Sequence, residues 1–177
     1  MSAVEGQMGV NASAAGAGLS AADSIKEQYL SFILGSEEYG VDIQKVQEIK
    51  GWDTVTRVPY SPPYVLGVIN LRGSIVPVID LRIRFGLEQI PHDATTVIIV
   101  VHVPGERGER IVGMVVDAVS DVYDIAAENI RPPPDALGSV DKVFVRGLAC
   151  QDKKMLILLD VDGLVIASVN SATKAAA

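Results

Sequence analysis

Residues 67–81 read GVINLRGSIVPVIDL, and this stretch decides the fold. Two runs rich in β-branched residues flank Arg72-Gly73, a pattern typical of a β-hairpin with strands at Gly67 to Leu71 and Ser74 to Leu81. The same pattern returns at an offset of 80, where residues 147–161 read GLACQDKKMLILLDV. Because the two stretches align without a gap, the sequence predicts an internal structural repeat.

The repeat extends upstream of the hairpin at an offset of 73. There the matching residues are Gly40, Val46, Glu48 and Ile49 in the first half, and Gly113, Val119, Asp121 and Val122 in the second. Each half is therefore predicted to contain two hairpins, joined by a bent or helical crossover and a proline-rich loop. A few short strands do not make a stable open sheet, so each half is expected to close into a small barrel. The barrels would share a core, and their interface would form a groove.

Elsewhere the apolar residues come in short bursts between turn signals, which indicates an all-β fold with a few short helices. Further strands are predicted at residues 29–34, 39–42, 97–103, 110–116, 143–148 and 155–160. Short helical turns are predicted at residues 43–49, 81–85 and 161–168. Residues 1–24 and 169–177, rich in Ala, Gly and Ser, are predicted to be flexible tails around a folded domain at residues 25–168.

Composition limits the kinds of function that the chain can have. With 49% hydrophobic and 21% charged residues among 177, the chain can bury a core. A net charge of −7 argues against a nucleic-acid partner, which clustered Lys and Arg would bind. The longest apolar runs, such as residues 97–101, are too short for a membrane-spanning helix of about 20 residues. A single cysteine, Cys150, forms no internal disulfide, so we expect a cytoplasmic protein without membrane insertion.

Residues that could carry catalysis are scattered along the chain. His92, His102 and Cys150 do not fall into any metal-binding or catalytic spacing. We therefore predict no catalytic site, no cofactor and no metal site. An enzyme of this sequence would have to use Asp, Glu or Cys150 without histidine support. The acidic residues between positions 37 and 53 lack the ligand spacing of a calcium loop, and they form either a solvated face or a docking surface.

Two features point to binding instead of catalysis. Arg72, at the tip of the predicted hairpin, can offer its planar guanidinium to a carboxylate or carbonyl of a partner, although a solvated arginine is the alternative. Residues 41–49, if helical, leave one aliphatic side chain outside the core as a contact for an amphipathic partner helix. The alternative for this segment is a helix with two buried edges.

Several segments resemble the CheW family of chemotaxis coupling proteins: residues 37–43 (EEYGVDI), 46–49 (VQEI), 67–82, 113–117, 119–122 and 130–132. The similarity runs from about residue 28 to about residue 164. It implies two SH3-like five-stranded β-barrels that share a hydrophobic core, without enzymatic activity. It also implies an adapter that couples the cytoplasmic tips of chemoreceptors (methyl-accepting chemotaxis proteins) to the histidine kinase CheA.

The resemblance further implies that the helical receptor tip lies in the groove between the barrels. By position, the implied receptor or kinase contacts are Ile43, Val46, Glu48, Ile49, Gly67, Asn70, Arg72, Val97 and Val122. How they divide between receptor and kinase stays open, as does the signalling pathway served. We expect a monomer that assembles into rings with the regulatory domain of the kinase, recruited from the cytoplasm to membrane receptor arrays.

Overall fold

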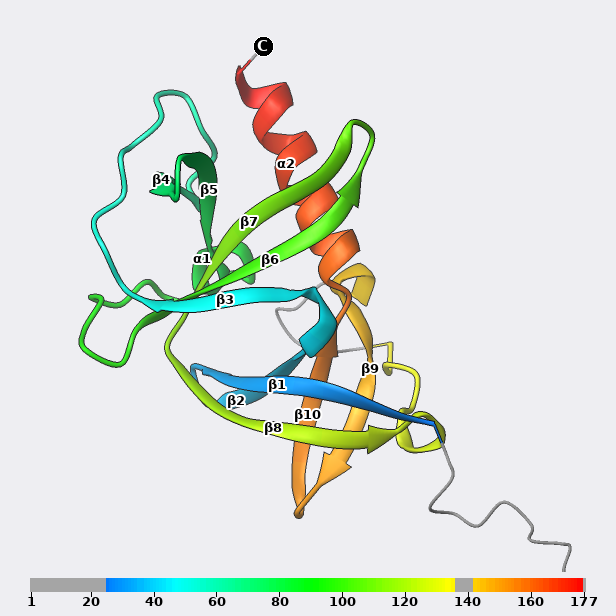
Figure 1. Ribbon diagram of the computed structural model, residues 1–177. Coiled ribbons are helices and arrows are strands. Elements are labelled where there is room, and N and C mark those ends of the chain that lie inside the picture. The colour runs from blue at the N-terminus through cyan, green and yellow to red at the C-terminus, as the bar shows by residue number, and fades with distance from the viewer. Residues whose placement is uncertain (1–24, 136–141, 177) are drawn as a thin grey trace, which may run out of the picture.

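The computed structural model describes residues 25–135 and 142–176, with side chains to residue 169. Within these residues, ten strands form two five-stranded sheets, each curled into a small barrel (Figure 1). The strands are β1 (Lys26–Leu34), β2 (Glu37–Asp42), β3 (Val46–Gly51), β4 (Val65–Leu71), β5 (Ser74–Asp80), β6 (Val97–Gly105), β7 (Gly108–Val116), β8 (Ala118–Ala126), β9 (Val145–Gln151) and β10 (Lys154–Leu159). The helices are α1 (Leu81–Arg84) and α2 (Val161–Ala176), and the single 3₁₀ turns are η2 (Ile43–Lys45), η3 (Ala127–Asn129) and η4 (Lys142–Phe144).

The internal repeat is present in the strand order of the two sheets. One sheet, which we call sheet A, has the order β8-β1-β2-β10-β9, and the other, sheet B, has the order β3-β6-β7-β5-β4. Strands five apart in number occupy corresponding places in the two sheets. Each sheet therefore combines strands from both halves of the chain. The prediction that each half closes into its own barrel is wrong, because the halves exchange strands.

Close packing at two matched glycines accompanies this exchange. Gly40 lies opposite Leu158 in the parallel pair of β2 and β10, and Gly113 lies opposite Val78 in the parallel pair of β5 and β7. A Cβ atom at Gly40 would lie 2.9 Å from Leu158 Cδ2, and one at Gly113 would lie 2.8 Å from Ile98 Cγ2. Real Cβ contacts are almost never this short, so both barrels use glycine where side chains from neighbouring strands meet.

The segment predicted as a helix at residues 43–49 is a single 3₁₀ turn followed by a strand. The turn η2 is capped by Asp42, whose Oδ1 accepts a hydrogen bond from the N–H of Gln44. From Val46 the chain pairs with β6, with Ile49 opposite Ile99. Half-buried and exposed residues alternate along β3, as in a strand that covers a core on one side. The helical interpretation failed because apolar spacing over so few residues fits either structure.

Helix α2 and one strand also differ in extent from the predictions. Helix α1 matches the predicted turn, whereas α2 continues to Ala176, through residues predicted to be a tail. Residues 142–144, predicted partly as strand, form η4 before β9 begins. The predicted tail at residues 1–24 lies outside the described residues.

The main hydrophobic core is shared between the two barrels. It joins Phe32 and Val41 of sheet A to Ile99 and Met114 of sheet B, and Leu164 of α2 packs into it. Two smaller clusters fill the barrels separately, one around Val78 and Val100 in sheet B and one around Leu156 and Leu158 in sheet A. The all-β fold with two five-stranded barrels and a common core is therefore confirmed. Among the described residues, no helix is both long enough and apolar enough to cross a bilayer.

Candidate interaction surface

Arg72 stands at the tip of the β4–β5 hairpin in a fixed turn. Its φ of 53° and the φ of 90° at Gly73 both lie in the left-handed region, which suits a two-residue hairpin turn. The side chain of Asn70 supports the turn, because its Oδ1 accepts a hydrogen bond of 2.8 Å from the N–H of Gly73. The side chain of Arg72 is 80% exposed. The turn thus fixes the backbone of Arg72 and leaves its guanidinium exposed to solvent.

An ion pair connects this tip to the edge strand β3. The Nη2 atom of Arg72 lies 3.2 Å from Oε2 of Glu48, whose side chain is only 22% exposed. Glu48 Oε2 is buried and its contact with Arg72 lacks hydrogen-bond geometry, so it has an unused acceptor. An exposed arginine gains little from such a pair, about 0–1 kcal/mol, and its remaining N–H groups stay available. The sequence could not show that these two charges meet.

The predicted residues Glu48, Asn70 and Arg72 form one polar surface, which we call the Arg72 patch, whereas Ile49, the residue after Glu48 on β3, points to the other face of the strand. Ile49 is 43% exposed, a large fraction for an isoleucine on a strand. Asn70 is exposed beside Arg72. The Arg72 patch therefore offers polar contacts to a partner, and Ile49 offers an apolar contact on the other face of β3.

Val122 occupies the position on β8 that Ile49 occupies on β3. The two residues correspond in the repeat, and both β3 and β8 are terminal strands in the order of their sheets. Val122 is 45% exposed, nearly the same fraction as Ile49. We call Ile49 and Val122 the edge-strand pair. Each barrel therefore presents one aliphatic side chain from a terminal strand of its sheet. Figure 1 draws β3 above β1 and β8 below β1.

The sequence patterns did not lead us to a second pair of exposed aliphatic residues. Ile75 on β5 is 67% exposed, and Met155 on β10, its counterpart in the repeat, is 54% exposed. Ile75 lies opposite Asn70, and Met155 lies opposite Cys150, which is also exposed. We call Ile75 and Met155 the hairpin pair. The sequence contained enough information to predict this pair. The two predicted hairpins fix which residues lie opposite each other, and side-chain alternation along each strand then points Ile75 and Met155 outward.

The remaining predicted contacts lie deeper in the fold. Ile43, Val46 and Val97 are partly buried and pack against the shared core. Gly67 is buried, and a Cβ atom there would lie 2.1 Å from the backbone oxygen of Thr56. Backbone hydrogen bonds of 2.8 and 2.9 Å join Thr56 to Val68 at this point. Gly67 thus allows the chain after β3 to close against β4, whatever else it contacts.

Two hollows flank the turn η2, where the chain passes from sheet A to sheet B. The larger, of about 550 Å³, is lined by residues 25–28, 42–44 and 124. In its wall Glu27 accepts hydrogen bonds from Tyr29 at 2.5 Å and from Arg146 at 2.9 Å. The bond from Tyr29 and the positive charge of Arg146 lower the pKa of Glu27, against the opposing effect of burial. The smaller hollow, of about 310 Å³, is lined by residues 42, 45, 146 and 159–162.

The residues first considered for catalysis have ordinary structural surroundings. The ring of His92 stacks on Trp52 at 3.8 Å, with Nε2 at 3.7 Å from Asp80 Oδ2. His102 lies 3.5 Å from Glu109 on the neighbouring strand. Across residues 25–135 and 142–176, no group of three His, Cys, Asp or Glu residues is placed to hold a metal ion.

The sequence and the fold both match known proteins. The family model described as "CheW-like domain" matches residues 28–168. The chemotaxis protein CheW of Klebsiella aerogenes is 46% identical over 145 residues, which are 82% of this chain and 85% of that protein. The chemotaxis protein CheW of Bacillus subtilis is 32% identical over 140 residues, 78% of this chain and 86% of that protein. The crystal structure of the scaffolding protein TtCheW from Thermoanaerobacter tengcongensis matches with a TM-score of 0.72 at 37% identity, covering 79% of this chain and 88% of that one.

Proposed function

The chain belongs to the CheW family, and we propose that it is a non-enzymatic adapter that couples the cytoplasmic tips of chemoreceptors to the histidine kinase CheA. In this role the chain acts by bringing two proteins together, so that the geometry of the kinase follows the conformation of the receptor. Joining two binding faces in one molecule raises the effective concentration of one partner near the other without any chemistry.

The observation that carries this proposal is the doubling of exposed aliphatic residues across the two barrels. A chain with a single binding surface has no need for matched exposed residues on both barrels, whereas an adapter needs at least two surfaces. Here the repeat supplies two pairs, Ile49 with Val122 and Ile75 with Met155. Covering these aliphatic side chains with a partner removes apolar surface from water, which favours association.

We assign the edge-strand pair and the Arg72 patch to the receptor. A receptor tip is helical, and a helix that lies between β3 and β8 would contact Ile49 from one barrel and Val122 from the other. The guanidinium of Arg72 would then bind a carboxylate or a backbone carbonyl of the receptor. Ile43, Val46 and Val97 are partly buried beside this surface, and we propose that they support or extend it together with Gly67.

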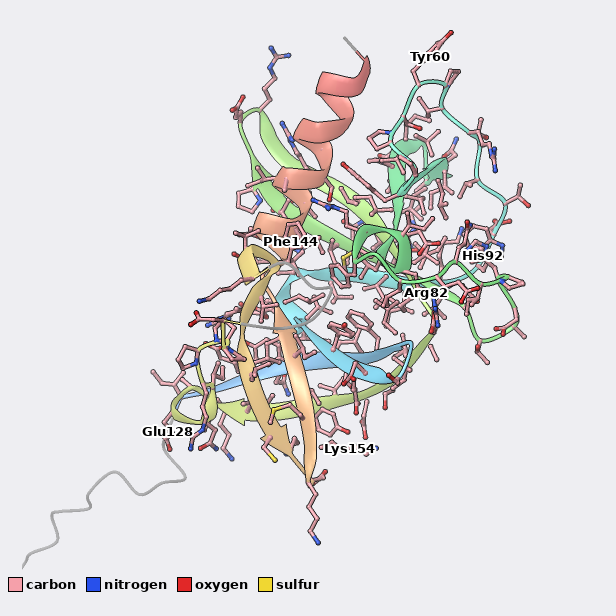
Figure 2. The ribbon with its side chains drawn as sticks, turned by 180° about the vertical axis from the view of Figure 1, so that it is seen from behind. Tyr60, Arg82, His92, Glu128, Phe144 and Lys154 are labelled. Carbon is pink, nitrogen blue, oxygen red and sulfur yellow. The ribbon has the colours of Figure 1, made fainter. Side chains whose placement is uncertain are left out.

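We assign the hairpin pair to CheA. Ile75 and Met155 lie on different barrels, so two kinase molecules could contact one adapter at separate places. Such two-sided contact with the regulatory domain of CheA builds a ring from adapters that are monomers when alone. Lys154, next to Met155, lies at the far end of the β9–β10 hairpin, at the opposite end of the molecule from Tyr60 (Figure 2). We propose that the adapter is cytoplasmic and joins membrane receptor arrays through its receptor surface.

The proposal is tested by a crossed pair of exposed substitutions, because each serves as the matched control of the other. Ile49→Asp is expected to weaken binding of a receptor cytoplasmic fragment at least about tenfold, since a buried carboxylate would face the partner's apolar surface. Met155→Asp is expected to leave that affinity unchanged and to weaken binding of CheA instead, because Met155 lies in sheet A, whereas Asn70 and Arg72 belong to the β4–β5 hairpin of sheet B. Both affinities are measured by titration calorimetry on variants whose circular dichroism matches the parent. A folded Ile49→Asp variant with the parent's affinity for the receptor fragment would contradict the assignment.

A further inference from the structure

The polypeptide crosses between the two sheets at two places. Strands β1 and β2 belong to sheet A, β3 to β7 belong to sheet B, and β8 to β10 belong to sheet A again. The first crossing is the turn η2, between β2 and β3. The second is the single residue Asp117, between β7 and β8. The covalent connection between the barrels therefore consists of these two short segments.

An ion pair joins each crossing to a helix, either α1, which follows β5, or α2, which follows β10. At Asp117 the partner is Arg82 of α1: Nε donates to Oδ1 and Nη2 donates to Oδ2, both at 2.7 Å. At η2 the Nζ atom of Lys45 lies 3.2 Å from Oδ1 of Asp162, in α2. Arg82 and Asp162 correspond in the repeat, at an offset of 80. The two contacts, which we call the crossover clamps, thus use matching helix positions with opposite polarity, and their crossing residues, Lys45 and Asp117, lie within one position of the offset of 73.

The Asp117 clamp is the stronger of the two. Its side chains are 15% and 19% exposed, and the two parallel hydrogen bonds give it the bidentate geometry of a strong ion pair. Asp117 Oδ2 also accepts a hydrogen bond of 2.9 Å from the N–H of Gly35, in the β1–β2 turn of sheet A. Arg82 Nη1 donates to the carbonyl of Glu88 at 2.9 Å. One contact therefore joins α1, the second crossing and a turn of the other barrel, at the level where the barrels meet (Figure 2).

The η2 clamp is weaker and lies within the proposed receptor surface. Its side chains are 30% and 37% exposed, so solvent screens the pair. Lys45 is flanked by Ile43 and Val46, both of which we have assigned to the receptor side. A partner that contacts Ile43 or Val46 would therefore also change the surroundings of the ion pair between Lys45 and Asp162.

We propose that the four clamp residues, Lys45, Arg82, Asp117 and Asp162, are positioning residues that set the angle between the two barrels. The inference rests on the proposed function, because a receptor helix that contacts both Ile49 and Val122 needs these residues at a fixed separation. If the barrels sample several angles, only the fraction of molecules at the correct angle binds, and the apparent affinity falls by that fraction.

The test measures the angle between the barrels directly in the isolated chain. Spin labels are attached to the native Cys150, exposed on β9 of sheet A, and to a cysteine introduced by Ser74→Cys, exposed on β5 of sheet B. Pulsed electron–electron double resonance gives the distribution of distances between the two labels. Arg82→Met removes the stronger clamp, and Asp162→Asn removes the weaker one by a nearly isosteric replacement of a half-buried side chain. Arg107→Met is the matched control, since Arg107 is exposed and forms no hydrogen bond or ion pair with the described residues.

We expect the distance distribution to broaden about twofold in Arg82→Met and measurably in Asp162→Asn, with no change in Arg107→Met. The affinity for the receptor fragment should fall about tenfold in Arg82→Met, which corresponds to one molecule in ten at the correct angle. Unchanged distributions in both clamp variants would overturn the inference. If Arg82→Met does not fold, the Asp162→Asn distribution alone decides. If the distributions broaden but the parent chain does not bind the receptor fragment, the clamps are real and the proposed function is wrong.

Discussion

Replacing Arg82 by methionine tests the energetics of the fold most sharply, because its guanidinium makes three hydrogen bonds, two of them to Asp117, 35 positions along the chain. Two of them go to Asp117 at 2.7 Å and one goes to the carbonyl of Glu88 at 2.9 Å. Removing one partner of a fully buried ion pair costs about 3–5 kcal/mol. Here both side chains are partly exposed, and Asp117 keeps its hydrogen bond from Gly35, so we expect a loss of about 2–3 kcal/mol.

The loss is measured by urea unfolding at neutral pH, followed by the fluorescence of the single tryptophan, Trp52. Because the two barrels share one core, we expect a single transition whose midpoint shifts while its slope stays constant. Arg107→Met, which removes an exposed arginine, should change the free energy of unfolding by less than about 0.5 kcal/mol. A midpoint for Arg82→Met that equals the parent's would refute the reasoning, since it would mean that this ion pair is not formed in solution.

Three further predictions follow from the packing, the carboxyl groups and the cysteine. Gly67→Ala should destabilise the chain by about 3 kcal/mol or more, because the new Cβ meets the backbone oxygen of Thr56. Gly51→Ala is the control, since a Cβ there meets open space, and comparing the thermal unfolding midpoints of the two variants tests the prediction. Glu27 and Asp117 have pKa values below the ordinary range, so the stability that they contribute is complete above about pH 5 and is lost as the pH falls through the folded-state pKa values; a chain equally stable at pH 3 and pH 7 would contradict this. The exposed thiol of Cys150 should react with a thiol reagent as fast in the folded chain as in urea, and strong protection would show that β9 is covered.

The pKa of Asp117 reflects opposing effects that the Arg82→Met variant separates. Burial raises the pKa of this carboxyl, but the hydrogen bonds from Arg82 and from the N–H of Gly35 outweigh it, so the pKa lies below its usual value. Without Arg82, burial meets less opposition and the pKa should rise. The variant should therefore lose less stability than the parent between pH 5 and pH 3.

The sequence was sufficient to predict the hairpins and the repeat, because turn residues and strand alternation are local signals. It could not show how the halves combine, since a repeat has the same sequence whether each half folds by itself or exchanges strands with the other. The exchange became visible only in the parallel pairing of β2 with β10 and of β5 with β7. The segment at residues 43–49 was misassigned for a related reason. Its apolar residues fit a short helix, and the pairing of Ile49 with Ile99 decides for a strand.

The candidate site was predictable in part. Arg72 was expected at a hairpin tip, and the structure places it there beside Glu48, at 3.2 Å. That contact joins a residue of β3 to the β4–β5 turn, 24 positions further along the chain, so no local pattern contains it. The exposure of Ile75 could have been predicted, because the β4–β5 hairpin was predicted correctly and its alternation points Ile75 outward. The contact assignments themselves stay predictions until partner binding is measured.

The most direct test of the central claim is whether this chain joins the two proposed partners. Receptor cytoplasmic fragments assembled on vesicles are sedimented with CheA, with the adapter present or absent, and with Ile49→Asp or Met155→Asp in place of the parent. The account predicts that the parent increases the CheA in the pellet. With Ile49→Asp neither adapter nor additional CheA should sediment, and with Met155→Asp the adapter should sediment with less additional CheA than the parent brings. Equal amounts of CheA in the pellet with and without the parent adapter would contradict the account.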